Sequence, residues 1–234
     1  MTGRFDGEIA ERTLGWKLWE DCWPNLAGLL AANLLFLLWC APSVVAAMLS
    51  LPGAAVALSL VTVGPALLGL FTYAANIALG RHASFWRDSL RGFRSGFGPA
   101  VMLGGVAIVV LTANRLSLSQ AQAAGMPAGA TALWAGQLGI LVILALTGLH
   151  TLSLLALYRQ GLNEASRNAV VLTLAHPAPL LGLMGVIVFT VWMTRALSWG
   201  PLIIMPALLA LLSVNTTLRL VKQHQPEGMD SSHE

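Results

Sequence analysis

Few side chains in the long apolar runs of this sequence are of types that do chemistry. The amide and imidazole side chains within these runs are Asn33, Asn76, Gln137, His150 and Asn215. No run contains Asp or Glu, although proton pumps and cation carriers usually hold a carboxylate at membrane depth. The sequence therefore argues against a proton or metal-ion antiporter.

His150 is the sharpest of these candidates, because an ionisable side chain inside an apolar run marks a functional site by default. Thr147 and Thr151 lie within one helical turn of it, and a neutral imidazole bonded to a hydroxyl or carbonyl oxygen explains it without function. Metal ligation would need further His, Cys or carboxylate partners at helical spacing, and none is present. We expect no metal site, and Asn33, Asn76 and His150 remain the candidate intramembrane polar site.

The sequence carries no recognised catalytic or nucleotide-binding signature. It has no His-Glu-x-x-His zinc motif, no Gly-x-Ser-x-Gly elbow and no Gly-x-x-x-x-Gly-Lys phosphate loop. We therefore predict no catalytic residue, no enzymatic activity and no cofactor. The 13 Lys and Arg residues are spread between the apolar runs rather than gathered in one basic domain, so we also expect no nucleic-acid partner.

The composition indicates the element that must position these side chains, which is a helix within a lipid bilayer. Hydrophobic residues make up 56% of the 234 residues and charged residues 10%, whereas a soluble domain carries roughly 25% charged residues. A hydrocarbon core about 30 Å thick takes about 20 apolar residues to cross as a helix. We expect an all-α, polytopic bundle of six transmembrane helices over residues 24–220.

The expected spans are separated by glycine and proline turns or by short polar segments. They cover residues 25–49, 54–79, 99–112 or as far as 118, 131–158, 169–191 and 199–220. Gly64 and Pro65 fall inside the second span, where the missing backbone donor of proline predicts a kink. His176 and Pro177 interrupt the start of the fifth span in the same way.

Two polar segments flank this domain. Residues 1–23 place Trp16, Trp19 and Trp23 near one helical face, which is typical of an amphipathic segment at the membrane surface. Residues 221–234 are short and polar, and we expect them to form a disordered cytoplasmic tail.

The basic residues predict the orientation of the chain. With six spans and the N-terminus inside, only Arg115 and Arg195 of the 13 Lys and Arg residues fall on the outer side. Short loops rich in Lys and Arg stay in the cytoplasm. We therefore expect a multi-pass protein of the bacterial cytoplasmic membrane with both termini in the cytoplasm.

The segment over residues 84–97 combines aromatic and basic residues, and Ser84 can cap a short helix there. We expect this helix to lie in the membrane surface, with its aromatic and leucine side chains toward hydrocarbon and its arginines toward water and lipid phosphate. The former are Phe85, Trp86, Leu90, Phe93 and Phe97, and the latter are Arg87, Arg91 and Arg94. Such a helix serves either as an anchor on the anionic inner leaflet or as a docking surface for a partner, with Phe85, Trp86 and the three arginines as contacts.

Several short motifs resemble one family. These motifs are Gly64-Pro65-Ala66, Gly80-Arg81, Phe85-Trp86-Arg87-Asp88, Arg91-Gly92-Phe93-Arg94 with Phe97, Asn168-Ala169 and His176-Pro177. The pattern is similar to that of the YesL-like family of bacterial membrane proteins, and the likeness is densest over residues 64–98. The resemblance implies a small multi-span protein of unassigned activity, often associated with genes for carbohydrate uptake beside ABC sugar importers. It supplies no catalytic residues.

Two functional hypotheses follow. The first is a non-enzymatic accessory component of carbohydrate uptake that contacts ABC sugar transporter subunits. The alternative is a stand-alone carrier or exporter of a small neutral or hydrophobic solute, because the interrupted second, fifth and sixth spans could line a cavity at the midplane. A water-accessible pocket at the intramembrane polar site would favour the carrier, and a solid core would favour the accessory role.

Overall fold

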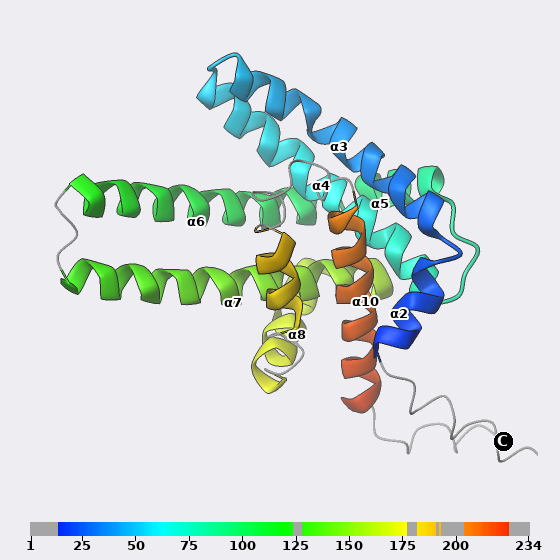
Figure 1. Cartoon of the computed structure of the whole chain (residues 1–234). Helices are drawn as coiled ribbons and strands as arrows, with labels where there is room; N and C mark the ends of the chain where they lie inside the picture. Colours follow the sequence, from blue (N-terminus) through cyan, green and yellow to red (C-terminus); the bar gives the residue numbers. More distant parts are fainter. Residues whose placement is uncertain (1–13, 124–127, 177–181, 191, 193–203, 225–234) are drawn as a thin grey trace, which may run out of the picture.

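The chain is helical throughout the part that the structure describes. A computed structural model describes residues 14–123, 128–176, 182–190, 192 and 204–224, and these residues contain no strand. Figure 1 shows long helices joined by short connections. This confirms the all-α prediction.

The helix bounds follow the apolar runs closely in the first two thirds of the chain. The helices are α2 (Leu14–Cys22), α3 (Leu26–Met48), α4 (Pro52–Ala78), α5 (Phe85–Ser95), α6 (Phe97–Ala123), α7 (Ala128–Tyr158), α8 (Leu162–Ala175) and α10 (Met205–His224). The short helix expected over residues 84–97 is present as α5 over a shorter range, and Phe97 begins α6 instead. The N-terminal segment is helical in α2, and its residues 1–13 lie outside the described part.

Four of these helices are long and apolar enough to cross a membrane. The qualifying stretches are Leu26–Met48 in α3, Pro52–Ala78 in α4, Phe97–Gln120 in α6 and Gly139–Tyr158 in α7. They coincide with the first four expected spans, which supports a protein embedded in a membrane as a helical bundle.

The expected fifth and sixth spans are not among these four helices. Within residues 169–191, α8 ends at Ala175 and a further helical stretch covers residues 182–190, so no single described helix covers the expected fifth span. The break falls where His176 and Pro177 predicted an interruption, although Pro177 itself lies outside the described part. In the expected sixth span, α10 begins at Met205 and residues 199–203 lie outside the described part. The expected tail beyond His224 also lies outside it.

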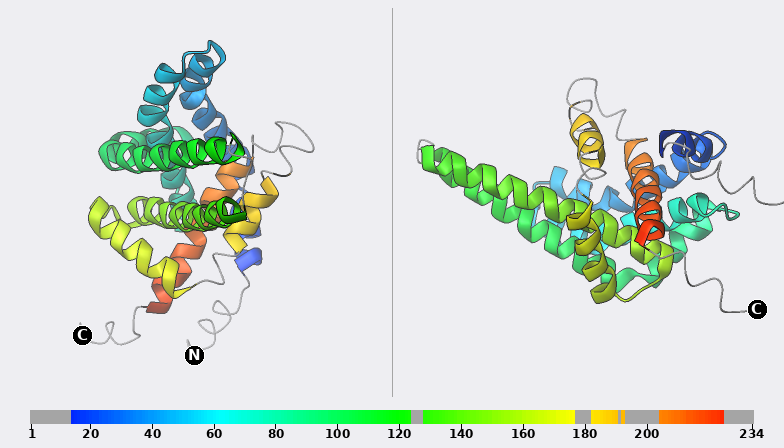
Figure 2. Two further views of the ribbon diagram at one scale, coloured as in Figure 1. Left: turned by 90° about the vertical axis from the view of Figure 1, so that its left-hand side faces the viewer. Right: turned by 90° about the horizontal axis from the view of Figure 1, so that it is seen from below.

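Helix α4 is the centre of the arrangement. It contacts α3, α5, α6, α7 and α10. The α3–α4 hairpin and the α6–α7 hairpin start from this shared region and diverge from each other toward their tips, as Figures 1 and 2 show. The packed core therefore lies at one end of the two hairpins.

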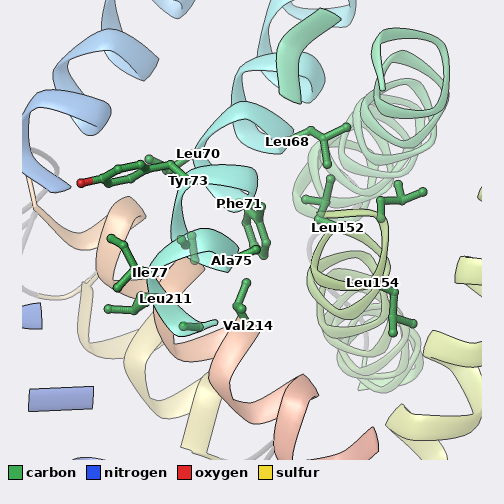
Figure 3. Packing of buried hydrophobic residues seen from close by; sticks show 14 of the residues in the cluster. Leu68, Leu70, Phe71, Tyr73, Ala75, Ile77, Leu152, Leu154, Leu211 and Val214 are labelled. Atoms are coloured by element: carbon green, nitrogen blue, oxygen red, sulfur yellow. The ribbon is translucent and has the colours of Figure 1, made fainter. Parts of the chain in front are cut away.

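The buried apolar residues gather around the C-terminal half of α4. Leu70 and Phe71 on α4 are almost fully buried, and so are Leu211 and Val214 on α10. Leu154 on α7 belongs to the same cluster (Figure 3). By contrast, the N-terminal half of α4 is largely exposed, as expected for a helix face in contact with lipid.

Glycines allow the neighbouring helices to approach α4 closely. A β-carbon at Gly69 would lie 2.6 Å from the backbone oxygen of Ser89 on α5. One at Gly64 would overlap the backbone oxygen of Ala100 on α6, and one at Gly92 would overlap the side chain of Thr72. Small residues at such contacts are the usual means of helix association in membranes, where apolar burial alone provides little driving force.

Pro65 does not end α4. The helix continues through this buried residue to Ala78, and the adjacent Gly64 meets the backbone of α6. The sequence predicted a kink at this pair, and the structure adds a packing role for its glycine.

Replacing Gly69 by alanine should lower the free energy of unfolding by about 1–3 kcal/mol, because the added methyl group meets backbone atoms that cannot rotate away. Gly98→Ala on α6 is the matched control, since nothing lies within 4 Å of its β-carbon position. That substitution should be neutral or stabilising by up to about 1 kcal/mol through helix propensity. Unfolding titrations in mixed micelles measure both, and equal effects of the two substitutions would contradict the close α4–α5 contact.

Candidate functional site

His150 lies fully buried on α7 and is bonded to α10. Its Nδ1 lies 2.8 Å from the hydroxyl oxygen of Thr217. The Thr217 hydroxyl donates its only proton to the backbone oxygen of Ser213, at 2.8 Å. This arrangement assigns Nδ1–H as the donor to Thr217, and a buried Nε2 without a partner in the described part fits a neutral imidazole with its proton on Nδ1. Nε2 is then a bare acceptor, and it is buried with no hydrogen-bond partner among the described residues.

A second polar contact joins the same two helices one turn away. The hydroxyl groups of Ser153 on α7 and Ser213 on α10 lie 3.0 Å apart, and both residues are fully buried. Together with His150 and Thr217 they form a row across the α7–α10 interface, which we call the polar seam. Each such bond between membrane helices contributes roughly 0.6–2 kcal/mol.

The polar seam combines three hydroxyl groups with one imidazole and contains no carboxylate. His150 is the only base in the seam, and no carboxylate in the described part of the chain orients it. The hydroxyl groups therefore lack the oriented base that activates a nucleophile. Among the described residues, no three His, Cys, Asp or Glu side chains come together as a metal site would require. The geometry fits a structural clasp between α7 and α10.

The other predicted polar residues lie apart from the polar seam. Asn33 is fully buried on α3, Asn76 is half-buried near the end of α4, and Gln137 is exposed on α7. The hydrogen bonds of the polar seam join His150 to α10 rather than to Asn33 or Asn76. The structure thus pairs His150 with Thr217 on α10, and the candidate site of Asn33, Asn76 and His150 stays a prediction.

One contact links the N-terminal segment to the end of the chain. The side-chain amide of Asn215 on α10 donates to the Asp21 carboxylate on α2 at 3.2 Å. Partial burial raises the pKa of Asp21, an effect opposed by this hydrogen bond and by nearby Lys17. Sequence reasoning missed the pair because the two residues are 194 positions apart and neither belongs to a motif.

Helix α5 presents its arginines outward and packs its small and polar residues inward. Asp88 and Ser89 are each 2% exposed and Gly92 is buried, so these residues form the face against α4. Arg87 and Arg94 are exposed, as predicted. The helix therefore rests on α4 through a face of small and polar residues, and its arginines lie outside that face.

The separation of aromatic from basic side chains on α5 is less complete than the sequence predicted. Phe85 and Trp86 are exposed, at 39% and 56%. Phe93 instead packs on Trp39 of α3, with ring centroids 4.5 Å apart, and Leu90 shares a surface hollow with the arginines. The expectation that all these side chains face hydrocarbon is therefore wrong for Phe93, because α3 lies close enough to cover it.

Asp88 fixes the start of α5. Its carboxylate accepts the backbone N–H of Ser84 at 2.8 Å and lies 3.6 Å from the Arg91 guanidinium. Ser84 occupies the predicted N-cap position, although its own side chain makes no capping bond. A buried carboxylate thus orients both the first turn of the helix and one of its arginines.

Comparison with known proteins adds no family assignment. No protein-family model matches the chain, and no curated protein or solved structure shows a significant similarity to it.

The His150–Thr217 bond predicts a specific pattern of stabilities. Thr217→Val should lower the free energy of unfolding by about 1–2 kcal/mol, because it leaves the buried Nδ1–H without an acceptor. Adding His150→Leu to that variant should restore part of the loss. Thr216→Val is the control, since its hydroxyl bonds only within its own helix, to Leu212. Independent, additive effects of the substitutions at 150 and 217 in a double-mutant cycle would contradict the bond.

Proposed function

We propose that this chain is a non-enzymatic accessory protein of the bacterial cytoplasmic membrane that supports carbohydrate uptake through contact with ABC sugar transporter subunits. Two observations support a role without catalysis. The polar seam contains no nucleophile with an oriented base, and the described residues hold no cluster of metal-ligating side chains. The link to carbohydrate uptake rests on the resemblance to the YesL-like family.

The exposure of α6 is the observation that carries the accessory role. Within its most apolar stretch only 6% of the residues are buried by the described chain, against 33–39% in α3, α4 and α7. Met102, Val106 and Val109 recur at helical spacing and are each more than half exposed. A rigid helix that the rest of the described chain leaves uncovered offers a lateral surface to the membrane helices of a partner.

The packing of the interior supports this role over a stand-alone carrier. A carrier needs a site at mid-membrane that water and solute can reach. Asn33, His150 and Ser153 are instead fully buried by neighbouring side chains. Two surface hollows in the described part open outward, one near the tips of α3 and α4 and the other along α5.

We further propose six spans with both termini in the cytoplasm. The four apolar helices account for the first four crossings. The remaining two would use α8 with the helical stretch at 182–190, and then α10 with the residues before it. The support is the sorting of basic residues, which leaves only Arg115 and Arg195 on the outer side.

The six-span arrangement predicts that residue 198 faces the outside. A Ser198→Cys variant in which Cys22 and Cys40 are replaced by serine should react with a membrane-impermeant maleimide added to intact spheroplasts. Ser231→Cys in the same background should react only after lysis. Labelling of residue 198 only after lysis would leave four crossings and contradict the last two spans.

The accessory role predicts recovery of transporter subunits with the purified protein. Extraction from native membranes in a mild detergent should recover the permease or ATPase subunits of a sugar importer. Replacing Met102, Val106 and Val109 together by alanine should reduce that recovery about tenfold, which corresponds to about 1.4 kcal/mol of binding free energy.

A matched triple variant on α3 serves as the control. Leu38, Val45 and Met48 are also more than half exposed, and their replacement by alanine should leave the recovery unchanged. Absence of any importer subunit from the wild-type preparation, identified by mass spectrometry, would contradict the proposed function.

A further inference from the structure

The exposed side of α5 carries a shallow, open hollow. The hollow has a volume of about 670 Å³. Its lining comes entirely from this helix and consists of Trp86, Arg87, Leu90, Arg91, Arg94 and Ser95. Three arginine side chains thus contribute to one open depression beside an indole ring and a leucine.

The three arginines lie on one face because their positions are four and three residues apart. Guanidinium groups match phosphate oxygens in a bidentate geometry, and this makes Arg the preferred residue for planar phosphate recognition. Arg91 is 48% exposed while its guanidinium remains 3.6 Å from the buried Asp88. One of the three guanidinium groups thus has a buried carboxylate beside it that favours one orientation.

The rotation of α5 about its axis is fixed by its contact with α4. Gly92 and Thr72 meet so closely that no β-carbon fits at position 92, and Ser89 lies over Gly69 in the same way. With the opposite face fixed, the backbone of α5 keeps the Cα atoms of the three arginines on the side of the hollow. This fixed orientation of the helix distinguishes α5 from a flexible basic helix that attracts anions only diffusely.

The position of α5 in the chain indicates that the phosphate would belong to a lipid headgroup. It lies between α4 and α6, two helices apolar enough to cross a membrane, with only residues 79–84 and 96 as connections. Both of its ends are therefore tied to the membrane surface, where lipid headgroups are concentrated. Trp86 prefers that depth, and Leu90 supplies an apolar contact suited to the glycerol and upper acyl region of a lipid.

We propose that the hollow on α5 is a binding site for the phosphate headgroup of one anionic phospholipid, with Arg87, Arg91 and Arg94 as its ligands. The proposal rests on the membrane embedding of the protein. It does not depend on contact with a transporter. The site holds the headgroup at a fixed place on the protein, so the lipid should remain bound when the bulk bilayer is removed.

The test is native mass spectrometry of the full-length protein in detergent, titrated with phosphatidylglycerol or phosphatidylcholine. One phosphatidylglycerol should be retained per chain, with clear preference over phosphatidylcholine. The triple variant R87Q/R91Q/R94Q should weaken this binding about a hundredfold, since each Arg near an anionic lipid surface contributes about one kcal/mol. The triple variant with lysine at these positions keeps the charge and should show an intermediate loss, because it lacks the bidentate geometry.

The matched control removes three other exposed basic residues of the expected inner side, in the variant R81Q/R159Q/R167Q. It carries the same change in net charge and should bind phosphatidylglycerol as the wild type does. If both triple glutamine variants lost phosphatidylglycerol binding equally, the attraction would be diffuse and the proposed site would be overturned. Equal retention of the two lipids would overturn it as well.

A competition arm separates a lipid headgroup from free phosphate. Millimolar inorganic phosphate should not displace the retained phosphatidylglycerol, and full displacement would contradict a lipid site. All measurements use the isolated protein without a transporter. Their failure would therefore leave the accessory role standing, and failure to recover an importer would leave the lipid site standing.

Discussion

The close approach of neighbouring helices to the C-terminal half of α4 is the constraint on which the rest of the structure depends. Gly64 and Gly69 remove the side chains that would keep α6 and α5 at a distance. Because apolar burial gives little driving force within lipid, such backbone contact must supply much of the association through dispersion and polar bonds. One end of each hairpin is consequently packed around α4, while the far ends diverge as lipid-exposed pairs (Figure 2).

The same core explains how the polar side chains are used. Where α10 packs against both α4 and α7, His150 and Ser153 find hydroxyl partners on α10 and are sealed from water. Where α5 packs on α4, its small and polar face is covered and its arginines remain on the surface. The polar side chains of the interior are therefore paired between helices, and the surfaces proposed to bind lipid and protein partners lie on α5 and α6.

Hydropathy alone predicted the first four apolar helices and α5, because runs of about 20 apolar residues and a basic aromatic segment are strong local signals. It did not predict the partner of His150 or the Asp21–Asn215 bond, since each pairing joins helices far apart in the chain. It also assigned Phe93 to lipid, because no local pattern shows that Trp39 lies beside it. Spans in the last third of the chain were the hardest to predict, since proline interrupts the apolar runs there.

Helix α5 packs on α4 through Asp88, Ser89 and Gly92, and a collision-accessibility scan of single nitroxide labels along residues 85–95 measures this packing, with Gly92 left out because no β-carbon fits there. Labels at 88 and 89 should be shielded from both a water-soluble and a lipid-soluble collision reagent, while labels at 87, 91 and 94 should meet the water-soluble one. A free amphipathic helix would instead shield its aromatic positions from water and expose 88 and 89, and that pattern would contradict the packing of α5 on α4.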